Sequence, residues 1–435
     1  MRRASFSALA GLSLLTAGLG CKQRDLPICD ITERACQVSI YYRVLNLRGD
    51  GYDPFGGLPP VSVVSEDEFR VMLEREYAAA AAENGPSPWD KALALLHFTS
   101  SEGAPVPVGG AAIDGGAGID GAAGIDGAAG IDGAAGPDAG NSAIDDMVEH
   151  YYAFYDPATK RVTIISHPDQ TGPYALEEAM VTLAHELVHA LQDREIDLKK
   201  DDFQTSDEYL ANAGIVEGDA RFYEFLFTEE VIRLMGQRPI DATQMPDVEL
   251  KAAYADLSAA GSPLFAAQYL MYPLGAKYEA MAYRSGGNAA VRHAYANAPI
   301  RTVGFLVGAD GRAPPVGSGD VCPAPAVGEL PTTGADQFGA VLFYTFLRGW
   351  GVGHDVAFAA AQTWTGDDLR VQSNDDLTTV AVAWRLEFSA PPPASIAQAL
   401  TASGELAVTT GASSLEITVS DSALPLVWTP TAPCR

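Results

Sequence analysis

Residues 185–189 limit the possible folds of this chain more than any other stretch. They read His-Glu-Leu-Val-His and lie in a segment whose apolar residues recur at three- and four-residue steps. These apolar residues are Leu176, Met180, Leu183, Leu187, Val188 and Leu191. The periodicity predicts a helix over residues 174–192 with one face buried. Since residues four apart share a helical face, the rings of His185 and His189 can converge on one ion.

This pattern predicts a zinc site. Zinc accepts neutral imidazole nitrogen, and a catalytic zinc site combines three protein ligands with a water molecule. Glu186 lies about 100° around the helix from His185, which suits contact with that water and a role as general base. Two simpler interpretations compete. The pentad arises by chance in roughly one sequence in a hundred of this composition, or the histidines are core residues that make hydrogen bonds.

The third ligand must come from another segment. The string Val-Glu-Gly-Asp-Ala at residues 216–220 lies on the next expected helix, and Glu217 within it could complete a His2Glu set. Asp219 and Glu224 are the alternatives, and Glu217 could also be an ordinary surface acid. Arg221, one turn later, would hold the ligand carboxylate or face the site.

Together these strings resemble a poorly characterised group of exported bacterial proteins related to the gluzincin metallopeptidases. The group shares His-Glu-Leu-x-His-Ala-Leu-Gln-Asp and a downstream Glu-Gly-(Asp or Glu)-Ala, and the likeness covers residues 61–388. Arg194 departs from the group, which tends to have Gln at this position, and the glycine-rich insertion described below is peculiar to this chain. The resemblance implies one Zn2+ ion bound by His185, His189 and Glu217, with Glu186 as the base. The implied reaction is hydrolysis of a bond in a peptide or protein substrate.

Several residues are candidates for supporting roles. The developing oxyanion of such a reaction needs a hydrogen-bond donor. Tyr272, Tyr295, His293 and Arg221 are candidates, although tyrosine and histidine on apolar helices are often packing residues. Asp193 could orient a ligand imidazole or cap the end of a helix. The competing functional hypothesis is a zinc-stabilised binding or envelope protein that does not turn over substrate.

The N-terminus and the cysteines predict export. Residues 1–21 combine a basic start, an apolar stretch and small residues before Cys21, as in a signal peptide. Cys21 is a candidate for lipidation and membrane tethering, although Gly18 replaces the usual Leu; ordinary secretion is the alternative. Four further cysteines suit two disulfides in an oxidising compartment, and three pairings are open. The preferred pairs are Cys29 with Cys36 and Cys322 with Cys434.

Charge restricts the partners. Asp and Glu number 56 against 28 Lys and Arg, which gives a formal net charge of −28. Nucleic-acid binding requires clustered basic residues and is therefore excluded as an expectation. Acidity of this degree is typical of a soluble, exported monomer.

The patterns predict an α+β fold, mostly helical and zincin-like, with a small hairpin or sheet beside the 174–192 helix. Glycine at every third position from residue 115 to residue 136 marks a flexible low-complexity insertion over residues 103–142. The expected organisation is a signal (1–21), a leader (22–60), a helical part (61–102), the insertion (103–142), a metallopeptidase core (143–390) and a tail (391–435). Other expectations are a strand at 38–47, helices at 65–82, 88–97 and 206–235, a hairpin at 152–165, a turn at 364–368 and a strand at 378–388.

Overall fold

The computed structural model describes residues 28–50, 56–83, 87–99, 144–145, 147–149, 151–170, 172–198, 203–238, 240–255, 257, 262–308, 321–327 and 330–421. The expected signal peptide with Cys21, the insertion over 103–142 and Cys434 lie outside these residues. Within them the fold is α+β, mainly helical with small sheets, as the sequence predicts.

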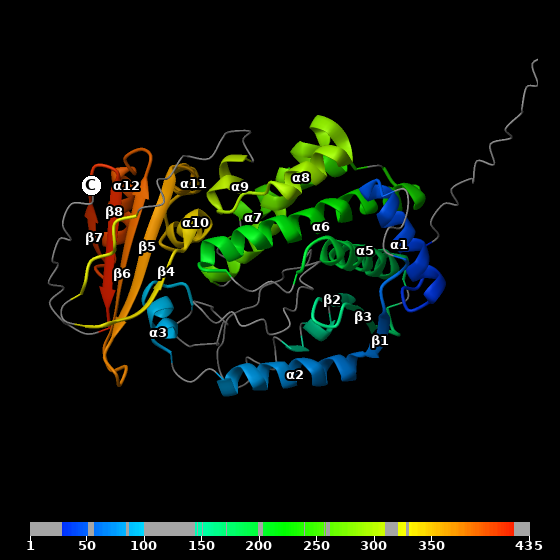
Figure 1. The fold of residues 1–435 in the computed structure, drawn as a ribbon, viewed down its shortest axis with the longest axis horizontal. Coiled ribbons are helices and arrows are strands. Elements are labelled where there is room, and N and C mark those ends of the chain that lie inside the picture. Colours follow the sequence, from blue (N-terminus) through cyan, green and yellow to red (C-terminus); the bar gives the residue numbers. More distant parts are fainter. Residues whose placement is uncertain are drawn as a thin grey trace, which may run out of the picture.

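Three long helices form the centre of the molecule (Figure 1). They are α5 (Pro173–Glu195), α6 (Ser206–Leu234) and α8 (Pro263–Ala296). Helices α6 and α8 cross very closely at Gly214 and Gly275. A Cβ on Gly275 would lie 1.7 Å from the carbonyl oxygen of Gly214, so the crossing requires glycine there. Helix α8 is interrupted at Gly286 and Gly287, and Gly287 takes a φ of 62°, which favours glycine. The chain therefore changes direction there, and residues beyond the break line a cavity together with residues of α6.

A three-stranded sheet lies beside α5, as expected. Its order is β1 (Val61–Ser65), β3 (Arg161–Ser166), β2 (Ala153–Asp156), with β1 parallel and β2 antiparallel to β3. Strands β2 and β3 form the hairpin that the β-branched run at 161–165 predicts. Helix α5 contacts both strands on one side, while α2 (Glu66–Glu83) contacts β1 and β3 and lies below them in Figure 1.

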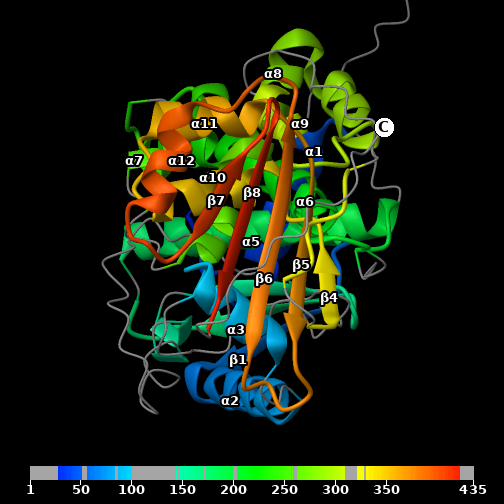
Figure 2. The same cartoon turned by 90° about the vertical axis from the view of Figure 1, so that its left-hand side faces the viewer.

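A five-stranded antiparallel sheet closes the other end of the molecule and faces the viewer in Figure 2. Its order is β4 (Thr332–Asp336), β5 (Trp364–Ser373), β6 (Val380–Phe388), β8 (Ser414–Ser420), β7 (Ala407–Thr410). Strand β8 pairs with β6 along its length, so part of the expected tail belongs to this sheet. The helices around it are α3 (Pro88–Leu95), α9 (Val303–Gly308), α10 (Gly339–Gly349), α11 (His354–Gln362) and α12 (Ala394–Thr401).

The core has two main parts. One is built on the large sheet with α3, α10 and the first halves of α6 and α8, and it contains the fully buried rings of Trp364 and Trp384. The other surrounds α5 and includes α1 (Arg34–Arg48), β2, β3 and the second half of α6. Helix α7 (Met245–Ala255) adds Leu250 to the first part. Both parts meet along α6 and α8, so these two helices connect the sheet to the region of the His-Glu-Leu-Val-His pentad.

Two local predictions are wrong. Residues 38–47 are helical, because Ile40 and Val44 follow one another at a four-residue spacing and bury one face of α1, which outweighs the β-branched alternation. Residues 364–368 begin strand β5 instead of forming a turn. There the carboxylate of Asp367 is buried and accepts hydrogen bonds from the backbone of Phe338 at 2.9 Å and from Nε1 of Trp384 at 2.7 Å.

Cysteine pairing agrees with the sequence where it is described. Cys29 and Cys36 form a disulfide that links the segment before α1 to the first turn of this helix. Cys322 is also disulfide-bonded, and its expected partner, Cys434, lies outside the described residues. Among the described helices, none combines the length and apolarity that a bilayer-spanning segment needs.

Candidate metal centre

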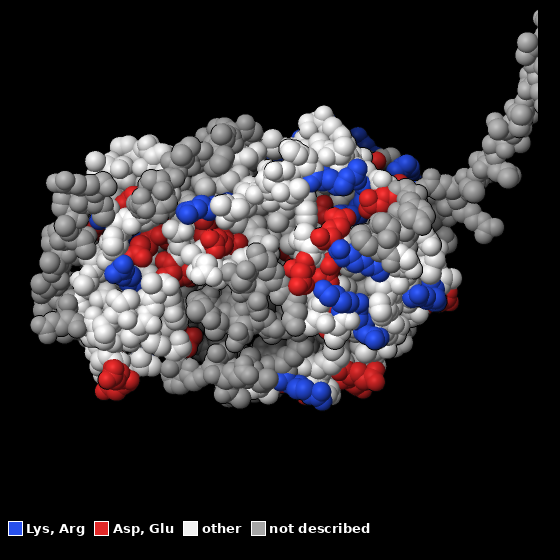
Figure 3. Space-filling model, viewed as in Figure 1, with Lys and Arg blue, Asp and Glu red and all other residues white. Residues whose placement is uncertain are grey.

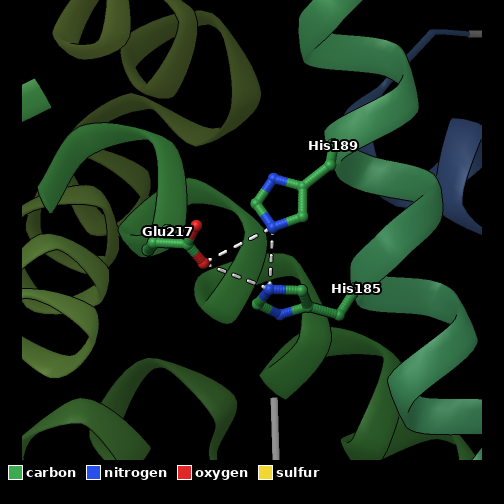
Figure 4. A group of neighbouring side chains, drawn as sticks. All are labelled: His185, His189 and Glu217. Atoms are coloured by element: carbon green, nitrogen blue, oxygen red, sulfur yellow. Dashed lines mark hydrogen bonds and ion pairs between the residues drawn. The ribbon is translucent and has the colours of Figure 1, made fainter. Parts of the chain in front are cut away.

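The structure brings the three predicted ligands together between α5 and α6 (Figure 4). Nε2 of His185 and Nε2 of His189, on successive turns of α5, lie 2.9 Å apart. Oε2 of Glu217, from α6, lies 3.4 Å from each of these nitrogens. The three side chains are almost fully buried, with residue exposures of 0%, 2% and 6%. A compact triangle of one oxygen and two nitrogens results.

This triangle has the size that a zinc ion requires. Two atoms that each lie about 2.0–2.1 Å from a tetrahedral zinc are roughly 3.3 Å apart, and the three edges measured here are 2.9, 3.4 and 3.4 Å. Within the described part of the chain, buried Oε2 of Glu217 accepts no hydrogen bond. A buried carboxylate oxygen without a donor is costly, and a cation at the centre of the triangle would remove that cost.

Hydrogen bonds behind the two imidazoles fix which nitrogen faces the triangle. Nδ1 of His185 lies 2.9 Å from Oε2 of Glu224, and an ionised carboxylate can only accept, so Nδ1 donates. Nδ1 of His189 lies 2.8 Å from Oε1 of Gln192. The amide nitrogen of Gln192 donates to the carbonyl of Val216 and to Asp219, which turns its oxygen toward His189. Both Nε2 atoms of the neutral rings therefore point lone pairs at the triangle, as metal ligands do.

The electrostatics of the cluster favour a positive charge at its centre. Burial lowers the pKa of His185, but the carboxylates of Glu217 and Glu224 outweigh it and raise that pKa to about 9. Burial likewise opposes ionisation of Glu217, but His189 and His185 bring its pKa down to about 2. The pKa of Glu224 is also lowered, since Arg221 and His185 counteract its burial. Without a metal, the cluster attracts protons to the histidines; a divalent cation would occupy the same position.

The carboxylate of Glu186 is held by the small sheet. It is fully buried, and its Oε2 accepts a hydrogen bond from the backbone nitrogen of Tyr155 in β2 at 2.7 Å. The β2–β3 hairpin thus positions the carboxylate that the sequence nominates as the base. Tyr155 is tied to α5 a second time, because its hydroxyl donates to Asp193 at 2.5 Å.

No family model, curated protein or solved structure matches this chain.

The other predicted residues have different positions. Arg221 pairs with Glu224 and, at 2.9 Å, with Glu249, and so supports the carboxylate behind His185. Asp193 accepts from Tyr155, from Lys160 at 2.7 Å and from the backbone of Leu198 at 2.9 Å. It therefore binds the hairpin and the segment after α5, whereas Gln192 orients the imidazole of His189.

The candidate oxyanion donors separate into near and distant ones. The ring of Tyr272 stacks against that of His185, with ring centres 6.5 Å apart, so Tyr272 lies beside the centre. His293 is exposed near the end of α8, where its ring contacts Asn297. Tyr295 lines a separate cavity next to Asp219. Of the tyrosine and histidine candidates, Tyr272 is therefore the one that the structure places near the proposed ligands.

The sequence does not predict that Gln192 and Glu224 hold the two imidazoles, although the spacing of each residue along its helix is consistent with that role. Gln192 lies three residues after His189, on the same face of α5. Glu224 lies two helical turns after Glu217, also on one face, and the sequence had suggested it only as a replacement ligand. Asp219, the other replacement, pairs instead with Arg48 at 2.6 Å and with Gln192 at 2.9 Å.

Proposed function

We propose that this chain is a zinc-dependent hydrolase that cleaves peptide bonds, with His185, His189 and Glu217 as zinc ligands and Glu186 as general base. The observation that carries the proposal is the convergence of two imidazole nitrogens and one carboxylate oxygen at separations that a zinc ion could bridge. The resemblance to gluzincin metallopeptidases supports the same assignment. It implies a peptide or protein substrate without specifying the sequence that is cut.

When bound, zinc would lower the pKa of a coordinated water to about 7 and polarise a substrate carbonyl. The residues supply the remaining functions. Glu224 and Gln192 hold the two imidazoles in the tautomer that ligates metal. Glu186, fixed by the backbone of Tyr155, accepts the proton of the attacking water and passes it to the departing amine nitrogen.

Export is part of the proposal. The Cys29–Cys36 disulfide supports an oxidising compartment, since cytosolic thiols are kept reduced. The signal-like N-terminus supports the same location. We place the protein in the cell envelope, tethered through a lipidated Cys21, or in the secreted fraction.

One observation favours a second candidate function. The exposures of 0%, 2% and 6% for the ligands suit a structural zinc that stabilises an envelope or binding protein. The two functions differ in the role of Glu186, which is needed for turnover but does not ligate the metal.

The test is Glu186→Gln, measured for bound zinc and for cleavage of a mixed peptide library by mass spectrometry. The proposed hydrolase requires that the variant keeps one zinc per chain and loses cleavage by at least about 100-fold, the scale of general-base contributions. Exposed Glu74→Gln on α2 is the matched control and should behave like the parent. If parent and Glu186→Gln give the same peptide products, or if the parent binds zinc without cleaving any peptide, the hydrolase proposal is wrong.

A further inference from the structure

A second candidate binding site lies next to the metal centre, in a cavity of about 800 Å³. Its walls are the ends of α1 and α5, the first half of α6, and the part of α8 beyond its break with the residues that follow it. Cavities of roughly 300–1,000 Å³ are typical of sites for small molecules. The three metal-binding side chains do not line it. Asp219 does, and Gln192 links its carboxylate to the imidazole of His189.

Carboxylates outnumber guanidinium groups in the cavity wall by two. The carboxylates are those of Asp50, Glu195, Glu208 and Asp219, and the guanidinium groups those of Arg48 and Arg292. Arg48 is already paired with Asp219 at 2.6 Å, and Arg292 lies 3.8 Å from Asp50. On the face that Figure 3 shows, acidic and basic side chains are also intermixed. The excess of negative charge favours a ligand with a cationic group.

Several polar groups in this wall lack close partners. Nε and Nη2 of Arg48 lie 3.8 Å from Asp50 and 3.9 Å from Glu195, too far for hydrogen bonds. The Arg48 side chain is only 6% exposed, and its buried Nε has no hydrogen-bond partner in the described part of the chain. The same holds for the buried hydroxyl of Tyr295. Burial raises the pKa of Asp50 and of Glu195, which agrees with carboxylates that are short of donors.

These groups define a chemical pattern. The two acids need a donor with positive charge, and the guanidinium of Arg48 needs an acceptor within a few ångströms of that donor. Beside them the wall is apolar, formed by Ile196, Phe203, Ile215, Val291, Pro299 and Ile300. A free carboxylate would satisfy Arg48 but would be repelled by the acids, whereas a simple alkylamine would offer the Arg48 guanidinium no acceptor.

We propose that this cavity binds the amino-terminal residue of a peptide, or an amino-acid amide. The ammonium group lies between Asp50 and Glu195, the adjacent carbonyl oxygen accepts from the guanidinium of Arg48, and an apolar side chain contacts the wall at Ile215 and Val291. This binding goes beyond the proposed hydrolysis, because it uses neither the metal ligands nor Glu186. It can therefore succeed or fail independently of activity.

The test is calorimetric titration of the full chain, as purified, with L-leucinamide. Two related compounds each remove one part of the pattern: N-acetyl-L-leucinamide has no charged amine, and 3-methylbutylamine has no carbonyl. The variant Glu195→Gln removes one carboxylate from the cavity, and its side chain is 35% exposed, so the change is compatible with folding. Glu74→Gln, an exposed acid on α2, is the matched control.

We expect saturable binding of L-leucinamide that acetylation weakens by about tenfold or more and loss of the carbonyl weakens measurably. Glu195→Gln should weaken it by about fivefold, the effect of one partly exposed charge pair, while Glu74→Gln leaves it unchanged. The proposal is overturned if no saturable binding occurs, if the acetylated compound binds equally well, or if Glu195→Gln binds like the control. Unchanged binding by Glu195→Gln is also the result expected if the amine of L-leucinamide coordinates the metal instead of binding in this cavity.

Discussion

Glu224 provides a quantitative test of how the proposed metal ligands are held. Its carboxylate lies 2.9 Å from Nδ1 of His185 and is supported from behind by Arg221. A hydrogen bond to a charged group contributes about 1.5–3 kcal/mol. Glu224→Gln keeps an acceptor oxygen but loses the charge, and Glu224→Leu loses both. We therefore expect zinc to bind about tenfold more weakly to Glu224→Gln and about 100-fold more weakly to Glu224→Leu.

The assay is competition for zinc with a chromophoric chelator, after circular dichroism has confirmed that each variant is folded. The matched control is Asp193→Asn. Asp193 is also a buried carboxylate close to the pentad, but it binds Tyr155, Lys160 and Leu198 instead of an imidazole. Its zinc affinity should stay within about twofold of the parent. Equal zinc affinities for Glu224→Leu and the parent, or an equal loss in Asp193→Asn, would refute the assignment of Glu224 to His185.

Two further predictions concern the contact between α6 and α8 and the large sheet. Gly275→Ala places a Cβ 1.7 Å from the carbonyl oxygen of Gly214 and should lower the free energy of unfolding, measured in urea, by about 3 kcal/mol. Gly172→Ala, with open space around it, should lower this free energy by less than about 1 kcal/mol. Equal losses in the two variants would contradict the close crossing of α6 and α8. Burial raises the pKa of Asp367 to about 7, so ionisation of this carboxyl group destabilises the folded state. Relative to Asp367→Asn, the free energy of unfolding of the parent should fall by about 3 kcal/mol between pH 5 and pH 8. Parallel pH curves for the two proteins would contradict this prediction.

The convergence of the two imidazoles could be predicted from the sequence because it depends on local helical spacing. His185 and His189 are four residues apart on an apolar helix, and α5 fixes their relation without reference to the rest of the chain. Glu217 was harder to predict, since its position depends on how α6 crosses α5. The sequence favours Glu217 over Asp219 and Glu224 from its place on the next expected helix, and the resemblance to a known pattern implies the same residue.

The supporting residues depend on tertiary packing and were therefore missed or misplaced. Whether Gln192 or Asp193 reaches His189 is decided by the rotation of the last turn of α5 against α6 and β2. The sequence could not decide between them, because both side chains carry an acceptor oxygen.

The five-stranded sheet shows a different limit of prediction from the sequence. The segment from Trp364 to Asp368 has the composition of a turn, yet it extends because Trp364 is buried and the Asp367 carboxylate joins β5 to α10 and β6. Strand β8 is paired with β6 across an intervening helix and strand. Pairing over such sequence separations is not visible in local patterns, so the sequence predicted β6 but not the sheet around it.

Elemental analysis of the purified chain beside His189→Ala tests the central claim most directly. The account predicts about one zinc per chain in the parent and a large loss of zinc in the variant, since removing one of three ligands opens the site. A parent chain that takes up no zinc even when it is supplied, or a His189→Ala variant that holds as much zinc as the parent, would contradict it.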